Sequence, residues 1–194
     1  GAGSIGSELC RQALNFGCKH LVIFDQHENG MFNIDQEFVK KYDPSRYSLI
    51  MGTVREADKL AAVREKFKPE TLVHAAAYKH VPMMEIAPTE AVKNNVFGTK
   101  NVIEQCQKAG VKRFVLVSTD KAVNPANVMG ASKRLAEMLV QTRASQGKMQ
   151  MAAVRFGNVL GSSGSVIPTF LKQIREGGPV TVTDRNIKRY FMTI

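Results

Sequence analysis

A glycine-rich turn at the start of the chain restricts the possible folds more than any other feature. The run Gly1-Ala2-Gly3-Ser4-Ile5-Gly6 leads into an amphipathic stretch and then into the apolar run Leu21-Val22-Ile23-Phe24, which ends in Asp25. Glycine lets the backbone turn sharply and approach a pyrophosphate, whose charge is bound by the N–H groups of the following helix. Asp25 follows Gly6 by 25 − 6 = 19 residues, close to the spacing of the acid that binds the adenosine ribose. The turn therefore predicts a βαβ unit that binds a dinucleotide.

The carboxylate of Asp25 also indicates which dinucleotide is bound. A negative charge there repels a 2′-phosphate, and the next residues, Gln26, His27 and Glu28, include no arginine that could bind one. NAD is therefore favoured over NADP. Candidate cofactor ligands lie in the glycine turn and at the ends of the following strands, and they are Gly3, Ser4, Ile5, Gly6, Asp25, Thr53, Val54, Ala75, Ala76 and Ala77.

Short β-branched runs alternate with longer amphipathic stretches along the whole chain. Strands are predicted at His20–Asp25, Tyr47–Met51, Thr71–Ala75, Arg113–Ser118, Gln150–Phe156 and Val180–Thr183. Helices are predicted at Ser4–Phe16, Asp35–Tyr42, Glu56–Phe67, Pro88–Ala109, Met129–Gln146 and Val166–Glu176. Strands without polar alternation are buried on both faces, and helices between them supply the crossovers. We therefore expect an α/β fold with a doubly wound parallel sheet, in one domain over residues 1–194.

Composition and charge narrow the classes of partner. The chain has 27 Lys and Arg against 17 Asp and Glu, a formal charge of +10, but the basic residues are scattered. The charge favours polyanionic ligands such as nucleotides, and without an RNA- or DNA-binding motif we expect no nucleic acid partner. No apolar run is long enough to span a bilayer, so no membrane contact is expected within this segment. Three distant cysteines indicate neither a disulfide scaffold nor a metal site, and favour the cytoplasm.

Both ends of the sequence suggest a longer protein. Gly1 already lies inside the glycine turn, and the last residues, 190–194, form an apolar run with no stop signal. We expect that a first strand precedes residue 1 and that a substrate lobe follows residue 194. A membrane anchor could also precede this segment and hold it at the cytoplasmic face of the membrane.

Several longer segments resemble a known family. They are GAGSIGSELCRQ, HAAAYKHVPMME, VKNNVFGTKNVIE, STDKAVNPANVMGASKR, RFGNVLGSSGSVIPTF and RYFMTI. Together they resemble the extended short-chain dehydrogenase/reductases with a Rossmann-like fold. Within that superfamily they are similar to the UDP-N-acetylglucosamine 4,6-dehydratases of capsular polysaccharide and flagellin glycosylation. The resemblance implies a bound NAD, a UDP-sugar substrate and a homo-oligomer.

The segment Ser118-Thr119-Asp120-Lys121 holds the candidate reaction residues. It lies at the carboxyl end of a predicted strand, where ligands bind in doubly wound sheets. From spacing alone, Asp120 and Lys121 could be either an acid–base pair or a surface ion pair. The resemblance implies that Thr119 hydrogen-bonds the C4 hydroxyl of the sugar, Asp120 protonates the leaving C6 oxygen, and Lys121 removes the C5 proton.

Two residues one helical turn apart show a departure from the superfamily. The superfamily places Tyr-x-x-x-Lys where this chain has Met129 and Lys133. Methionine cannot act as the base for hydride transfer, because its thioether carries no exchangeable proton. The resemblance gives Lys133 its usual role at the nicotinamide ribose. A second departure is Thr53, since the branch usually has Asp at that position against the adenine.

The resemblance also implies residues that bind the substrate. Asn158 is expected near the phosphates, with Ser165 and Val166 near the uracil. Arg189 is either a phosphate ligand or a surface cation, and Lys79 follows the alanine turn as a further substrate ligand. His74 has no metal-ligand spacing around it, so we expect a structural histidine and no metal.

Two rival functions remain open at this point. A nucleotide-sugar 4-epimerase shares the fold and the first oxidation, although the missing tyrosine argues against it. A non-catalytic NAD-binding sensor or scaffold is the second rival, and the intact segment 157–170 argues against that. The function we expect is a UDP-sugar 4,6-dehydratase, which is a lyase.

Overall fold

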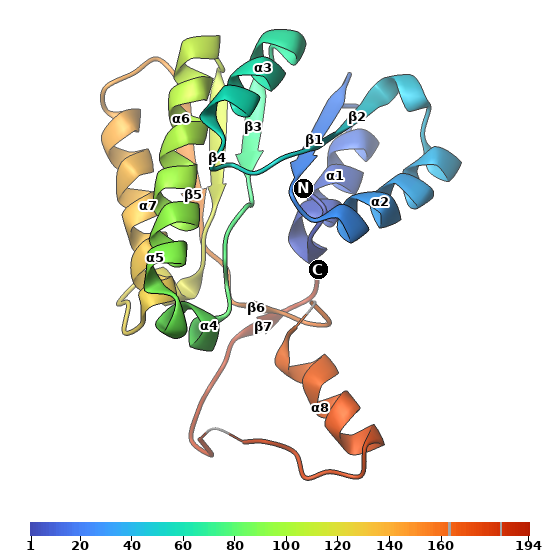
Figure 1. The fold of residues 1–194 in the computed structure, drawn as a ribbon, viewed down its shortest axis with the longest axis vertical. Coiled ribbons are helices and arrows are strands. Elements are labelled where there is room, and N and C mark those ends of the chain that lie inside the picture. Colours follow the sequence, from blue (N-terminus) through green and yellow to red (C-terminus); the bar gives the residue numbers. More distant parts are fainter. Residues whose placement is uncertain (163, 183) are drawn as a thin grey trace.

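The computed structural model describes residues 1–162, 164–182 and 184–194. Strands and helices alternate along most of it (Figure 1). The strands are β1 (Leu21–Asp25), β2 (Tyr47–Met51), β3 (Thr71–His74), β4 (Arg113–Val117), β5 (Gln150–Val154), β6 (Asn158–Val159) and β7 (Phe191–Met192). The α-helices are α1 (Ser4–Asn15), α2 (Glu28–Lys41), α3 (Ala57–Phe67), α4 (Val81–Ile86), α5 (Pro88–Ala91), α6 (Gly98–Ala109), α7 (Val128–Ala144) and α8 (Val166–Arg175).

All strand pairs in the described residues are parallel. β1 pairs with β2, and β3, β4 and β5 form a second sheet in that order. β1 and β3 are not hydrogen-bonded to each other, so β1–β2 and β3–β5 form two neighbouring groups rather than one continuous sheet (Figure 1). Among the described residues, β6 and β7 pair separately from both groups. The predicted parallel α/β architecture is confirmed.

Each of these two groups of strands packs against its helices in an apolar core of its own. In the larger core, α6 and α7 pack on β4 through residues such as Ile103, Phe114 and Val140. In the smaller core, α1 and α2 pack on β1 and β2 around Leu14 and Phe38. Because Phe114 and Phe38 are fully buried, each group of strands has its own hydrophobic anchor.

Two helix predictions need correction. The helix predicted from Asp35 begins at Glu28, because the His27 side chain accepts a hydrogen bond from the Gly30 N–H and caps the helix. The helix predicted over Pro88–Ala109 is interrupted by a π-helical segment, η2 (Val92–Phe97).

The strand predicted at Val180–Thr183 is wrong in its described part. Residues 180–182 form no strand, and Thr183 lies outside the described residues. The Thr181 N–H donates instead to the side chain of Gln173. A strand needs a neighbour for its backbone groups, and here a side chain takes that place.

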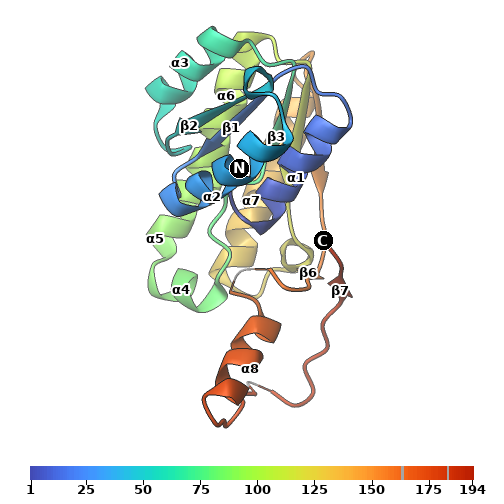
Figure 2. The same cartoon turned by 90° about the vertical axis from the view of Figure 1, so that its right-hand side faces the viewer.

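The C-terminal part of the chain is built differently from the rest. β6 and β7 are two-residue strands that pair with each other, and α8 has no buried residue. α8 projects away from the strands and the other helices (Figure 2). Within the described residues no helix combines the length and apolarity needed to cross a bilayer.

Candidate functional site

The glycine turn and Asp25 meet at the carboxyl end of β1. One Asp25 oxygen accepts hydrogen bonds from the Gly1 amino group at 2.6 Å and the Ala2 N–H at 2.7 Å. The other accepts from the His27 N–H at 2.9 Å. Burial raises the pKa of Asp25, but the hydrogen bond and charge of the Gly1 amino group, together with the bonds from Ala2 and His27, leave the pKa below its ordinary value. Asp25 therefore lies beside the turn with both carboxylate oxygens hydrogen-bonded.

Gly6 and Gly3 of the turn differ in the space that surrounds them. A Cβ on Gly6 would lie 2.5 Å from the Gly1 carbonyl oxygen, so the turn itself excludes a side chain there. A Cβ on Gly3 would meet nothing within 4 Å, so the space above Gly3 at the start of α1 is open. This opening at a helix N-terminus has the features that a pyrophosphate site requires.

The loop after β2 carries Thr53 and Val54. Val54 is buried, and the Asn101 side chain donates hydrogen bonds to the carbonyls of Val54 and Arg55 at 3.2 and 3.3 Å. The Thr53 hydroxyl oxygen accepts from the Arg55 N–H at 3.4 Å. The loop is therefore fixed to α6, and the Thr53 O–H remains able to donate.

The segment after β3, with Ala75, Ala76 and Ala77, is anchored by a residue that we did not predict. The Asn95 side chain accepts from the Tyr78 N–H at 2.8 Å and donates to the Tyr78 carbonyl at 3.0 Å. It also donates to the Ser132 hydroxyl at 2.9 Å. Asn95 stands beside Lys93 and Asn94 in the sequence, so its local pattern gives no signal of this role.

Thr119, Asp120 and Lys121 form one connected group just after β4. The Thr119 hydroxyl donates to the Asp120 carboxylate at 2.9 Å, and the Lys121 ammonium donates to the same oxygen at 3.0 Å. Burial raises the pKa of Asp120, but the bonds from Lys121 and Thr119 outweigh it, so its pKa is lowered. Lys121 also donates to the Asn158 side-chain oxygen at 3.4 Å.

Lys133 and Met129 lie on α7, and Lys133 contacts the end of β4 just before Thr119. Lys133 is buried and donates to the Val117 carbonyl at 2.7 Å. Burial lowers its pKa to about 8, against the opposing effect of the Glu137 carboxylate. Met129 is 3% exposed and packs with Met84 and Ala91, which makes it a core methionine.

His74 is a buried structural residue, as expected. Its Nε2 lies 3.0 Å from the Thr99 hydroxyl. Burial, followed by the charge of Lys133, lowers its pKa to about 3. The ring is therefore neutral, and no group of three or more potential metal ligands occurs among the described residues.

The predicted substrate residues are less closely assembled. The Asn158 side-chain oxygen accepts from Lys121, and its role at the phosphates stays a prediction. Ser165 precedes α8 with a buried hydroxyl oxygen that has no hydrogen-bond partner, and Val166 is exposed. Lys79 is exposed, and partial desolvation by the surrounding protein lowers its pKa. Arg189 is exposed and donates to the carbonyl of its neighbour Lys188.

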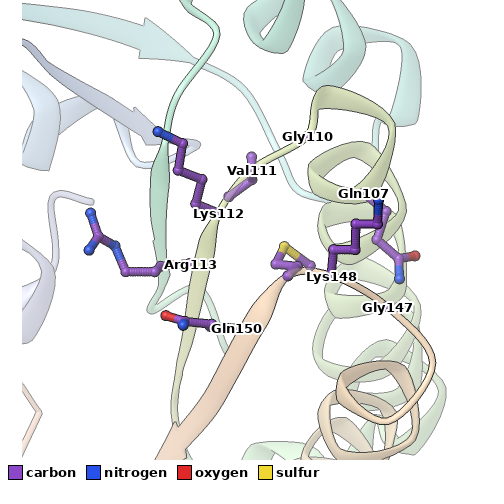
Figure 3. A pocket seen from close by; sticks show the side chains of 9 residues that line it. Gln107, Gly110, Val111, Lys112, Arg113, Gly147, Lys148 and Gln150 are labelled. Atoms are coloured by element: carbon purple, nitrogen blue, oxygen red, sulfur yellow. The ribbon is translucent and has the colours of Figure 1, made fainter.

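A cavity of about 700 Å³ lies apart from these candidate site residues (Figure 3). It is lined by the segments 110–113 and 147–150 and by Gln107. These segments precede β4 and β5 or begin them, so the cavity lies at the opposite ends of the strands from Thr119 and Asn158. It contains none of the predicted site residues.

The fold and the arrangement of these residues are those of an extended short-chain dehydrogenase/reductase domain. The chain belongs to the family described as polysaccharide biosynthesis protein, whose profile matches residues 1–194. It is 50% identical to the capsular polysaccharide biosynthesis protein CapD of Staphylococcus aureus, covering 99% of this chain and 32% of CapD.

Two further relatives carry the names of different activities. A UDP-N-acetylglucosamine 4,6-dehydratase (inverting) of Campylobacter jejuni is 34% identical, with 100% of this chain and 58% of that protein covered. A UDP-glucose 4-epimerase of Rickettsia rickettsii is 36% identical, with 100% and 57% covered. The chain thus spans between about a third and three fifths of the length of these relatives.

Solved structures resemble the chain over nearly its whole length. Pen from Bacillus thuringiensis matches with a TM-score of 0.91 and 35% identity, covering 99% of this chain and 58% of that one. DesIV, a dTDP-glucose 4,6-dehydratase from Streptomyces venezuelae with NAD bound, matches with a TM-score of 0.86 and 24% identity. It is covered over 66% of its length, against 99% of this chain, and the likeness shows the shared fold.

Proposed function

We propose that this chain is the NAD-binding and catalytic part of a UDP-sugar 4,6-dehydratase, with UDP-N-acetylglucosamine as the substrate. The observation that carries the proposal is the hydrogen-bonded group Thr119, Asp120 and Lys121 at the carboxyl end of β4. The core position of Met129 supports it further, because the usual tyrosine base is replaced by a residue that packs and carries no proton.

The residues present fit NAD. Gly3, Ser4, Ile5 and Gly6 would bind the pyrophosphate at the start of α1, where the structure is open above Gly3. Ionised Asp25 would bind the adenosine ribose, and the loops of Thr53 and Val54 and of Ala75–Ala77 would line the adenine side. Lys133 would contact the nicotinamide ribose. When bound, NAD would supply a hydride carrier that accepts a hydride from C4 of the sugar and returns it to C6.

The first proton transfer uses Thr119 and Asp120. Thr119 donates its hydroxyl hydrogen to Asp120, and its oxygen accepts from the Lys121 N–H at 3.4 Å. The second lone pair of that oxygen can accept from the C4 hydroxyl of the sugar. The proton that leaves the C4 oxygen can therefore pass through Thr119 to the Asp120 carboxylate. The lowered pKa of Asp120 is in keeping with this order, because the group starts ionised and ready to receive the proton.

The elimination then uses both members of the pair. The Lys121 ammonium first releases one proton to solvent, and the resulting amine then takes the proton from C5. Asp120 gives its newly gained proton to the C6 oxygen, which leaves as water. Lys121 returns a proton to C5 when C6 is reduced, and it then regains one from solvent. The sugar loses one water in total, and Asp120 and Lys121 end in the states in which they began.

One incubation tests this function and its rivals. Full-length protein is mixed with UDP-N-acetylglucosamine and NAD, and the products are examined by mass spectrometry and by proton NMR, which distinguishes C4 epimers. The proposal predicts a 4-keto-6-deoxy product lighter by one water. A C4 epimer of unchanged mass would identify an epimerase. This alternative is retained because a 36% identical relative from Rickettsia is named a UDP-glucose 4-epimerase. Bound NAD with no change in the sugar would identify the sensor.

A further inference from the structure

A buried carboxylate on α7 connects three elements beneath the candidate reaction residues. Glu137 has a side chain only 2% exposed. One of its oxygens accepts from the Ser118 hydroxyl at 2.6 Å and from Arg155 Nε at 2.8 Å. The other accepts from Arg155 at 2.6 Å and from Arg134 at 3.1 Å. Every bond is charge-assisted, and Arg155 binds in the bidentate geometry that fixes orientation most strongly.

The partners of Glu137 adjoin the site on both sides. Ser118 directly precedes Thr119 at the end of β4, and Arg155 directly follows β5. Backbone bonds continue this connection, from the Ser118 N–H to the Val154 carbonyl at 2.7 Å and from the Asp120 N–H to the Phe156 carbonyl at 3.1 Å. Glu137 therefore joins the segment that carries Asp120 and Lys121 to the segment that leads to Asn158.

Glu137 also acts on Lys133, which lies one helical turn earlier. Burial opposes ionisation of Glu137, but bonds from Arg155, Ser118 and Arg134 outweigh it and lower its pKa to about 2. Its negative charge raises the pKa of Lys133 and so offsets part of the lowering by burial. The other titratable group facing Lys133 is His74 on β3, which is neutral.

We infer that Glu137 and Arg155 form a positioning pair that sets the relative placement of Asp120, Lys121 and Lys133 for the reaction. The inference rests on the proposed function. Neither residue reaches the sugar: both act through the ends of β4 and β5 and through the charge that Lys133 experiences. A displacement of about 1 Å at a reacting group can reduce the rate on the order of 10²-fold.

The test compares Glu137→Gln with Arg155→Lys in the full-length protein. Glu137→Gln removes the charge, whereas Arg155→Lys keeps it but loses the bidentate geometry. We expect both variants to reduce dehydration per bound NAD on the order of 10²-fold. Because unfolded protein does not bind NAD, dividing the rate by the amount of bound NAD gives the turnover of the folded molecules alone. Glu104→Gln is the matched control, because Glu104 pairs with Arg143 at the surface, at 3.6 Å, and should keep the parental rate.

A lysine NMR titration supplies a second readout that needs no substrate. With isotope-labelled lysine and bound NAD, the Lys133 signal is assigned by its loss in Lys133→Arg. Glu137→Gln should titrate Lys133 at a lower pKa than the parent, whereas Arg155→Lys should stay near the parental value. If Glu137 acted only through packing and hydrogen bonds, with no effect of its charge on Lys133, the two variants would titrate Lys133 alike.

Parental turnover per bound NAD, or an unshifted Lys133, in folded Glu137→Gln overturns the inference. If Glu137→Gln does not fold, parental turnover in Arg155→Lys overturns it instead. A parent that forms no dehydrated product overturns the proposed function, and the titration still decides whether Glu137 controls the charge of Lys133.

Discussion

The two halves of the candidate site are held in place by very different means. The reaction half, at the ends of β4 and β5 and on α7, is anchored by buried groups such as Lys133 and Glu137. The substrate half, residues 157–194, consists of two short strands and α8, which has no buried residue. The reaction half is fixed by the larger apolar core. The substrate half is attached to the reaction half through contacts such as the hydrogen bond from Lys121 to Asn158.

Under the proposed function, this difference would separate the chemistry of the reaction from recognition of the substrate. Proton transfer needs groups placed to within a fraction of an ångström, and the buried hydrogen bonds of the reaction half provide that rigidity. Binding of a nucleotide can tolerate adjustment of an exposed segment. We therefore expect changes in the reaction half to affect catalysis or folding, and changes in the substrate half to affect affinity.

The largest expected effect concerns Asp120. Asp120→Asn removes the carboxylate that receives and delivers the proton, so dehydration should fall by about 10²–10⁴-fold while NAD binding persists. The matched control is Asp184→Asn in the exposed substrate half, which should remain close to the parent. Rates from mass spectrometry and NAD affinity from calorimetry check both, and equal losses in the two variants would remove the distinction between the halves.

A second prediction concerns stability. Phe114 on β4 is fully buried, so Phe114→Ala should reduce the free energy of unfolding by about 3–5 kcal/mol. Leu171 on α8 is 49% exposed, and Leu171→Ala should change it by no more than about 0.5 kcal/mol. Urea unfolding of the 194-residue chain measures both. A cost for Leu171 as large as that for Phe114 would mean that α8 is covered in solution.

Cofactor choice should depend on Asp25. Replacing it by Asn removes the charge that repels a 2′-phosphate, so the preference for NAD over NADP should shrink by about tenfold, or about 1.4 kcal/mol. Calorimetric titration of both cofactors into parent and variant measures the ratio. Equal affinities in the parent would contradict the role given to this carboxylate.

The smallest effect is expected at Met129. Met129→Leu roughly keeps the volume of a buried core residue, so it should cost less than about 1.5 kcal/mol in stability and leave much of the turnover. A loss of several orders of magnitude in a folded variant would show that the sulfur takes part in the reaction.

Local patterns predicted the elements better than the contacts between them. Asp25 and the segment 119–121 are contiguous motifs, and each lies at the carboxyl end of a predicted strand. Asn95 and the pairing of Glu137 with Arg155 were missed, because their roles depend on contacts between elements distant in sequence. No local pattern records such contacts.

Errors in the elements have similar causes. The residues His27-Glu28-Asn29-Gly30 have turn-like composition, yet they begin α2 because His27 caps it. Residues 180–182 have strand-like composition but lack a strand neighbour. Composition describes what a segment can form, and the surrounding structure decides between the possibilities.

Hydrogen exchange at C5 of the sugar tests the central claim most directly. The reaction is run in deuterated water with the parent and with Lys121→Met, and deuterium at C5 is measured alongside water loss. If Lys121 is the base, the parent forms a product that carries deuterium at C5, and Lys121→Met loses exchange and dehydration together by about 10²–10⁴-fold while still binding NAD. Exchange and dehydration in Lys121→Met at near the parental rate would place the base elsewhere and contradict the account.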